Sequence, residues 1–191
     1  PDERHIKYED VRILKQNISV ELNIEGNPKE QSFIDLVLET VPNQVTLVPD
    51  TTGQLTSDHG WDTIKNKSFL KEMIELFKTK NIRTSLFVDP DENFIVGAKE
   101  VGTDRIELYT ESYSANFKKD PLKAIKPFII ASKLASELKL GLNAGHDLNL
   151  ENLKYFSNNL ENLKEVSIGH ALIADALNYG MENTVNMYLR A

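Results

Sequence analysis

Two histidines stand directly after short apolar runs, and a glycine precedes each of them. Residues 141–145 lead to His146, and residues 166–169 lead to His170. An apolar run of this length is typical of a parallel strand buried on both faces. In α/β barrels the chemistry lies at the carboxyl ends of such strands. Histidine exchanges a proton near neutral pH, and glycine lets backbone N–H groups approach a ligand. The two strand ends therefore predict one rim for acid–base chemistry.

Two glutamates are also placed where a carboxylate could act. Glu25 ends the run 20–25, so it is either a general base at a strand end or a residue that caps the next helix or faces solvent. Glu107 lies inside an apolar run, and buried carboxylates are rare unless they are paired or functional. Because Arg105 shares its face of the strand, the alternative to a functional role is an internal ion pair or a position on an edge strand.

The last histidine also precedes a helix-like segment. Gly169 and His170 would place backbone amides at the helix start, where barrels of this kind often bind phosphate. His5 and Thr56 carry no local signal, and neither does His59. The polar loop 50–60 that contains Thr56 and His59 is a candidate lid. The sequence contains no HExxH motif, cysteine or EF-hand loop, so no metal site is expected.

These residues need a scaffold that brings them together. Apolar spacing predicts six strand–helix units preceded by one helix. The expected strands are 20–25, 45–49, 84–88, 105–110, 141–146 and 166–170. The expected helices are 8–18, 28–41, 62–80, 91–101, 121–139, 150–159 and 171–189, with a loop from residue 111 and a kink or restart at Pro127.

Alternating strands and helices predict a parallel sheet with right-handed crossovers. The favoured fold is an α/β (β/α)₈ TIM barrel that lacks its first two strands in this sequence, in a single domain 1–191. We therefore expect the sequence, which begins at Pro1, to lack an N-terminal segment of the natural protein. The alternative is an open doubly wound sheet. It is less favoured because neither GxGxxG nor GxxxxGK[ST] is present.

Composition narrows the classes of partner. The 191 residues carry a formal net charge of −7, which argues against a general nucleic-acid surface. No apolar run approaches the length of a membrane span, and no signal-peptide pattern opens the chain. Cysteine is absent, which excludes disulfides and thiolate chemistry and fits a cytoplasmic location.

Several short motifs occur together and in order along the whole chain. They are Arg4-His-Ile, Asp10-Val-Arg-Ile-Leu, Glu21-Leu-Asn-Ile-Glu, Leu47-Val-Pro, Leu55-Thr, Ser85-Leu-Phe-Val-Asp, Ile106-Glu-Leu, Asn143-Ala-Gly-His and Ile168-Gly-His-Ala. In this combination the chain resembles the pyridoxine 5′-phosphate synthase family of the deoxyxylulose-dependent vitamin B6 pathway. Asn-Ala-Gly-His together with Ile-Gly-His-Ala is the specific part of this resemblance.

The resemblance implies a transferase that condenses 3-amino-2-oxopropyl phosphate with 1-deoxy-D-xylulose 5-phosphate. The products are pyridoxine 5′-phosphate, phosphate and water. It also implies a barrel with extra helices, a homo-octamer built from dimers, and no metal or organic cofactor. By this resemblance Glu25 would be the general base, His146 the proton donor and Glu107 the stabiliser of the transition state. His5 and Thr56 would contact the deoxyxylulose phosphate. The amino-oxopropyl phosphate would be bound by Asp147, Gly169 and His170.

The chain departs from the family pattern at two places. Asp147 stands where the family usually has glycine, and a carboxylate beside a phosphate is unfavourable. We therefore expect the backbone N–H to make that contact, with the side chain turned away. The family also has a catalytic histidine and a substrate-binding arginine before the position of Pro1. The alternatives to this family are another phosphosugar barrel enzyme, such as an epimerase or aldolase, and a non-catalytic barrel fragment. An aldolase would need a lysine at a strand end.

Overall fold

A computed structural model describes residue 3 and residues 5–191 of the chain. Arg4, which belongs to the first motif of the resemblance, lies outside these described residues. The described residues form a parallel sheet whose strands neighbour one another in chain order. The strands are β1 (Asn23–Gly26), β2 (Gln44–Leu47), β3 (Arg83–Val88), β4 (Arg105–Tyr109), β5 (Gly141–Gly145) and β6 (Leu163–Ser167).

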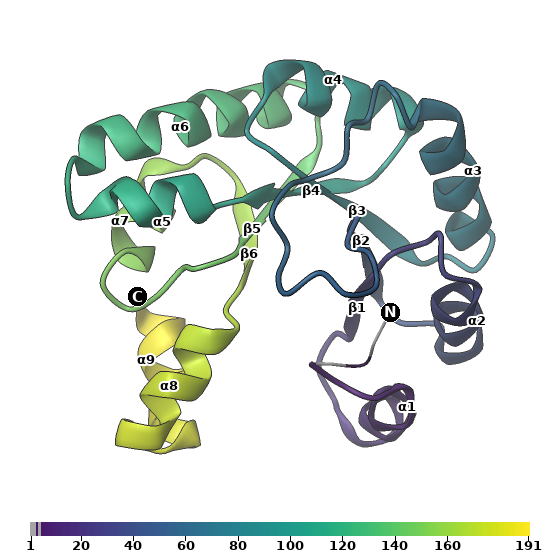
Figure 1. The fold of residues 1–191 in the computed structure, drawn as a ribbon, viewed down its shortest axis with the longest axis horizontal. Coiled ribbons are helices and arrows are strands. Elements are labelled where there is room, and N and C mark those ends of the chain that lie inside the picture. Colours follow the sequence, from purple (N-terminus) through teal and green to yellow (C-terminus); the bar gives the residue numbers. More distant parts are fainter. Residues whose placement is uncertain (1–2, 4) are drawn as a thin grey trace.

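The sheet curls into a half-barrel (Figure 1). A doubly wound sheet would reverse its strand order at a switch point, whereas this order runs from β1 to β6 without reversal. The expected partial (β/α) barrel is therefore confirmed, and the doubly wound alternative is wrong. Within the described residues no ladder joins β6 to β1, so these six strands do not close into a ring.

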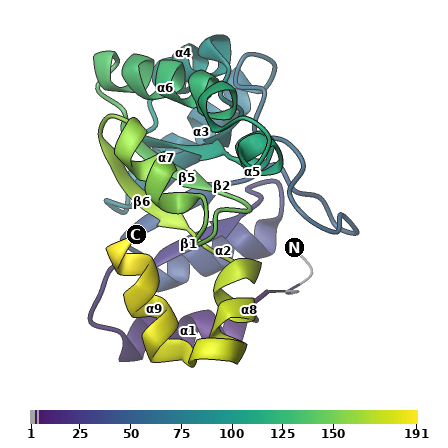
Figure 2. The ribbon, with the colours of Figure 1, turned by 90° about the vertical axis from the view of Figure 1, so that its left-hand side faces the viewer.

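Some of the helices cover the convex side of the curl (Figure 1). The helices are α1 (Tyr8–Asn17), α2 (Gln31–Thr40), α3 (Lys67–Lys78), α4 (Glu92–Val101), α5 (Glu111–Phe117), α6 (Pro121–Glu137), α7 (Leu153–Asn159), α8 (His170–Tyr179) and α9 (Met181–Arg190). Figure 2 shows α3, α4 and α6 on one side of the sheet, with α1, α8 and α9 at the opposite end of the molecule. The concave side of the curl opens toward that end.

The helix faces predicted from apolar spacing build the core against the sheet. In α3, Leu70, Ile74 and Phe77 are all buried, as their helical spacing requires. Burying each such side chain contributes about 1.5–3 kcal/mol relative to leaving it in water. Gly102 ends α4 in the left-handed conformation, as its position after the last apolar residue predicted.

Three details of the predicted helices are wrong. Residues 111–117 form α5 rather than a loop, because Tyr113 packs fully buried against Phe128 and Phe156. Helix α6 runs through Pro127, so the restart that was one of the two outcomes expected there does not occur. Only one helical hydrogen bond is lost there, and the buried face of α6 outweighs it. The expected last helix is two helices, which divide at Gly180 with a φ of 77°.

A polar layer fills the N-terminal half of the concave face. It consists of Gln44, Arg83, Arg105, Asn143 and Glu165. Within it, Arg105 Nη1 lies 2.5 Å from Glu165 Oε1, and Asn143 Nδ2 lies 3.1 Å from Glu165 Oε2. These bonds satisfy partly buried charges, which would otherwise be costly to remove from water. The carboxyl ends of the strands, above this layer, are left for the residues described next.

Candidate functional site

One cavity of about 1080 Å³ lies at the carboxyl ends of the strands. Every site residue expected from the sequence lines it. These residues are His5, Glu25, Thr56, Glu107, His146, Asp147, Gly169 and His170. They come from β1, β4, three loops and the start of α8, so only the curl of the sheet brings them together.

Glu107 projects from the middle of β4 and is 1% exposed. The ion pair considered as its alternative is wrong, because Arg105 pairs with Glu165 instead. Gly145 on the neighbouring strand makes room for the carboxylate, since a Cβ at position 145 would clash with Glu107 Oε1. Burial raises the pKa of Glu107 strongly, and a hydrogen bond from Ser167 opposes this shift. The carboxyl group is therefore held ready to exchange a proton near neutral pH.

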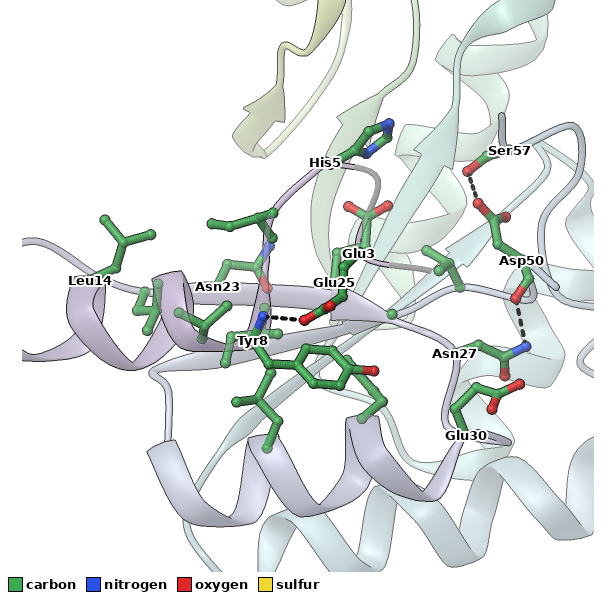
Figure 3. Close-up of a pocket in the computed structure, with 18 residues that line it drawn as sticks. Glu3, His5, Tyr8, Leu14, Asn23, Glu25, Asn27, Glu30, Asp50 and Ser57 are labelled. Carbon is green, nitrogen blue, oxygen red and sulfur yellow. Dashed lines mark hydrogen bonds between the residues drawn. The ribbon is translucent and has the colours of Figure 1, made fainter. Parts of the chain in front are cut away.

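Glu25 lies near the end of β1, between the main cavity and a second one of about 330 Å³. Desolvation raises the pKa of Glu25, and the neighbouring carboxylates of Glu107 and Asp50 raise it further. The side chain remains accessible to water, so solvent screens part of this effect. Figure 3 shows the second cavity, in which the Ser57 hydroxyl donates to Asp50.

His146 follows β5 directly and contacts Thr56 of the cavity wall and Tyr109 of β4. Its Nε2 lies 2.9 Å from Thr56 Oγ1, in the loop after β2. Its ring packs edge-on against Tyr109, with ring centroids 4.9 Å apart. The side chain is 17% exposed, so both contacts hold it at the cavity surface rather than in bulk solvent. A histidine held in this way can pass a proton to a ligand in the cavity.

His5 and His170 meet on the far wall of the cavity. Their rings are perpendicular, with centroids 5.9 Å apart, although they lie at opposite ends of the sequence. His170 begins α8, and Gly169 is the N-cap residue of that helix, where no described side chain caps it. The first-turn N–H groups of a helix without a side-chain cap favour an anion. This wall is therefore suited to a phosphate group.

Three polar residues of this region were not predicted from the sequence. The Tyr109 hydroxyl donates to the Ser57 carbonyl at 3.3 Å, and burial raises the pKa of Tyr109 to about 12, so the phenol stays protonated. Asp50 accepts from Ser57 Oγ at 2.7 Å. Tyr109 could have been found, because it lies two residues after Glu107 and shares its strand face. Loop residues such as Asp50 and Ser57 carry no comparable periodic signal.

Among residue 3 and residues 5–191, no three histidine, aspartate or glutamate side chains are grouped so that they could hold a metal ion. In the same part of the chain, no helix combines the length and the apolar character that a membrane span needs.

Comparison with known proteins gives a consistent result over the whole chain. The family model described as "Pyridoxal phosphate biosynthesis protein PdxJ" matches residues 1–191. The chain is 57% identical over 190 residues to the pyridoxine 5′-phosphate synthase of Flavobacterium johnsoniae, covering 100% of this chain and 80% of that protein. It is 57% identical over 190 residues to the enzyme of that name from Christiangramia forsetii, with the same coverage. It is 54% identical over 188 residues to that of Bacteroides fragilis, covering 98% and 79%.

Proposed function

The chain belongs to the family of the pyridoxal phosphate biosynthesis protein PdxJ, and on that premise we propose that it is a pyridoxine 5′-phosphate synthase. The proposed substrates are 3-amino-2-oxopropyl phosphate and 1-deoxy-D-xylulose 5-phosphate. The observation that supports this most is that all eight expected site residues line one cavity at the carboxyl ends of the strands. A cytoplasmic location and assembly into a homo-octamer are part of the same proposal.

The condensation needs proton transfers at carbon and oxygen, loss of water and loss of phosphate. Glu25 is suited to remove protons, because a carboxylate with a raised pKa is a stronger base than an ordinary one. His146 is suited to donate them, since its ring is held at the cavity surface. Glu107 lies buried beside them, where it would act on charge that develops in the transition state.

The phosphate groups of the two substrates need separate anion sites. The start of α8, with Gly169 and His170, would supply backbone N–H groups to the amino-oxopropyl phosphate, together with the N–H of Asp147. His5 and Thr56, which also line the cavity, would contact the deoxyxylulose phosphate. The loop that carries Thr56 already contacts His146, so it is placed to shield the reaction from water.

The direct test is to incubate the protein with both phosphorylated substrates and follow pyridoxine 5′-phosphate by its absorbance. His146→Asn should reduce turnover far more than substrate binding. His59→Asn is the matched control, because His59 is also accessible to solvent but does not line the cavity. Binding of both substrates without any product from the unmodified protein would favour the non-catalytic alternative. Turnover of a different phosphosugar would favour an epimerase or aldolase.

A further inference from the structure

Two consecutive residues after β5 adopt the left-handed conformation. His146 has a φ of 88° and Asp147 a φ of 58°. Aspartate tolerates this region better than most residues, whereas for histidine it is uncommon. Backbone strain of this kind persists when surrounding contacts fix it, and it is concentrated at functional sites.

Side chains from two helices hold these two residues in place. The Thr110 hydroxyl donates to the His146 carbonyl at 2.5 Å, and the Ser114 hydroxyl donates to the Asp147 carbonyl at 2.6 Å. Asn152 Nδ2 reaches the same Asp147 carbonyl at 3.3 Å. Both carbonyls of the strained pair therefore accept hydrogen bonds from side chains at or near the starts of α5 and α7.

This backbone conformation brings the Asp147 carboxylate next to the Nδ1 atom of the His146 imidazole. Asp147 Oδ2 lies 3.2 Å from His146 Nδ1. That nitrogen is buried and makes no well-aligned hydrogen bond to any residue that the structure describes. The other ring nitrogen, Nε2, lies on the side of Thr56 and the cavity. Asp147 and Thr56 thus approach different nitrogens of the ring.

We propose that the Asp147 carboxylate is a positioning residue for His146. It keeps the proton of the neutral ring on Nδ1, and it stabilises the imidazolium when Nε2 carries the proton to be donated. The Asp147 side chain thus acts on the expected proton donor. Its backbone N–H remains available to a phosphate. This inference rests on the proposed function, because it assigns to His146 the role of proton donor.

Two variants distinguish the effect of the Asp147 carboxylate from the effect of the strained backbone. Asp147→Asn keeps the shape and tolerates the left-handed conformation but removes the charge. Asp147→Gly also removes the backbone strain. If the carboxylate positions His146, both variants should lose kcat by roughly 10- to 100-fold with little change in KM. This loss is smaller than for a fully buried triad carboxylate, because Asp147 is half exposed. Asp35→Asn, an exposed carboxylate on α2, is the matched control and should keep wild-type kcat.

A second readout does not depend on turnover. In ¹⁵N NMR of the ligand-free protein above pH 8, the His146 proton should reside mainly on Nδ1, and Asp147→Asn should move it toward Nε2. An unchanged tautomer together with an unchanged kcat would overturn the inference. A rise in KM with constant kcat would also overturn it, because that result assigns the carboxylate to substrate binding. If the wild-type protein makes no pyridoxine phosphate, the proposed function fails, and the NMR result still decides the role of Asp147.

Discussion

Thr56 Oγ1 lies 2.9 Å from Nε2 of His146, so the loop after β2 reaches across the cavity to the expected proton donor. The contact joins residues 90 positions apart in the sequence. It also occupies the ring nitrogen that faces the cavity. A ligand that accepts a proton from His146 must therefore replace Thr56 at this nitrogen or bind beside it.

Replacing Thr56 by valine tests this loop contact. The variant keeps the shape of the side chain but loses the hydroxyl, and one hydrogen bond contributes about 1 kcal/mol. We expect KM for the deoxyxylulose phosphate to rise by roughly fivefold, with little change for the second substrate. Steady-state kinetics with each substrate varied in turn measure this. Thr56→Ser retains the hydroxyl and should behave like the wild type; an equal loss in the serine variant would show that the methyl group matters instead.

Replacing Glu25 by glutamine tests the general base. Glutamine has almost the same size but cannot accept a proton, so turnover should fall by roughly 100-fold or more. Circular dichroism and thermal unfolding should show an intact fold. Near-normal turnover in this variant would remove Glu25 from the mechanism. Glu30→Gln is the control for the loss of local negative charge. Glu30 is a nearby glutamate that lines the second cavity but not the main one.

Glu107→Gln should change how stability depends on pH. The pKa of Glu107 is raised in the folded chain, so the folded state binds this proton more tightly than the unfolded state does. The wild type therefore loses stability as the pH rises from the ordinary carboxyl range through the raised pKa. Glu107→Gln does not lose stability in this way, because glutamine has no proton to release in this pH range.

The Tm of Glu107→Gln should accordingly exceed that of the wild type above neutral pH, and the difference should shrink toward acidic pH. Thermal unfolding at a series of pH values measures both curves. Glu137→Gln, an exposed glutamate on α6, reports the effect of removing a surface charge. A difference between Glu107→Gln and the wild type that is constant with pH would contradict the proposed ionisation.

Gly145→Ala tests whether this glycine serves the carboxylate on the next strand. Its Cβ would clash with Glu107 Oε1, so the variant should lose about 1–3 kcal/mol in the free energy of unfolding. In a Glu107→Ala background the same change should cost much less, because the clashing atom is gone. Urea unfolding of the four proteins gives this coupling as a double-mutant cycle. Additive losses would show that Gly145 is required for another reason.

The parallel sheet and the position of the strand-end residues at one cavity were predictable from the sequence, because both depend on patterns along single strands. His5 and Thr56 carry no such pattern and were expected only from the family resemblance. Glu107 was found by its place in an apolar run, and His146 by its place after one. The partner of Arg105 was not predictable, because Glu165 lies 60 positions away on another strand. The left-handed conformation of Asp147 was not predicted, since it depends on hydrogen bonds from the hydroxyl of Ser114, 33 positions away, and from the side-chain amide of Asn152, five positions away.

The aromatic packing around Tyr113 has a consequence for how substrate range could change. Its hydroxyl donates to the Asn152 carbonyl at 2.7 Å, and Asn152 in turn donates to the Asp147 carbonyl. Hydrogen bonds through Asn152 thus connect the cavity wall that contains His146 to the close-packed core. The opposite wall, residues 51–58, reaches His146 and Tyr109 through single polar contacts. Laboratory evolution toward bulkier phosphosugars should therefore accumulate its substitutions in 51–58, while positions 110–114 stay constant.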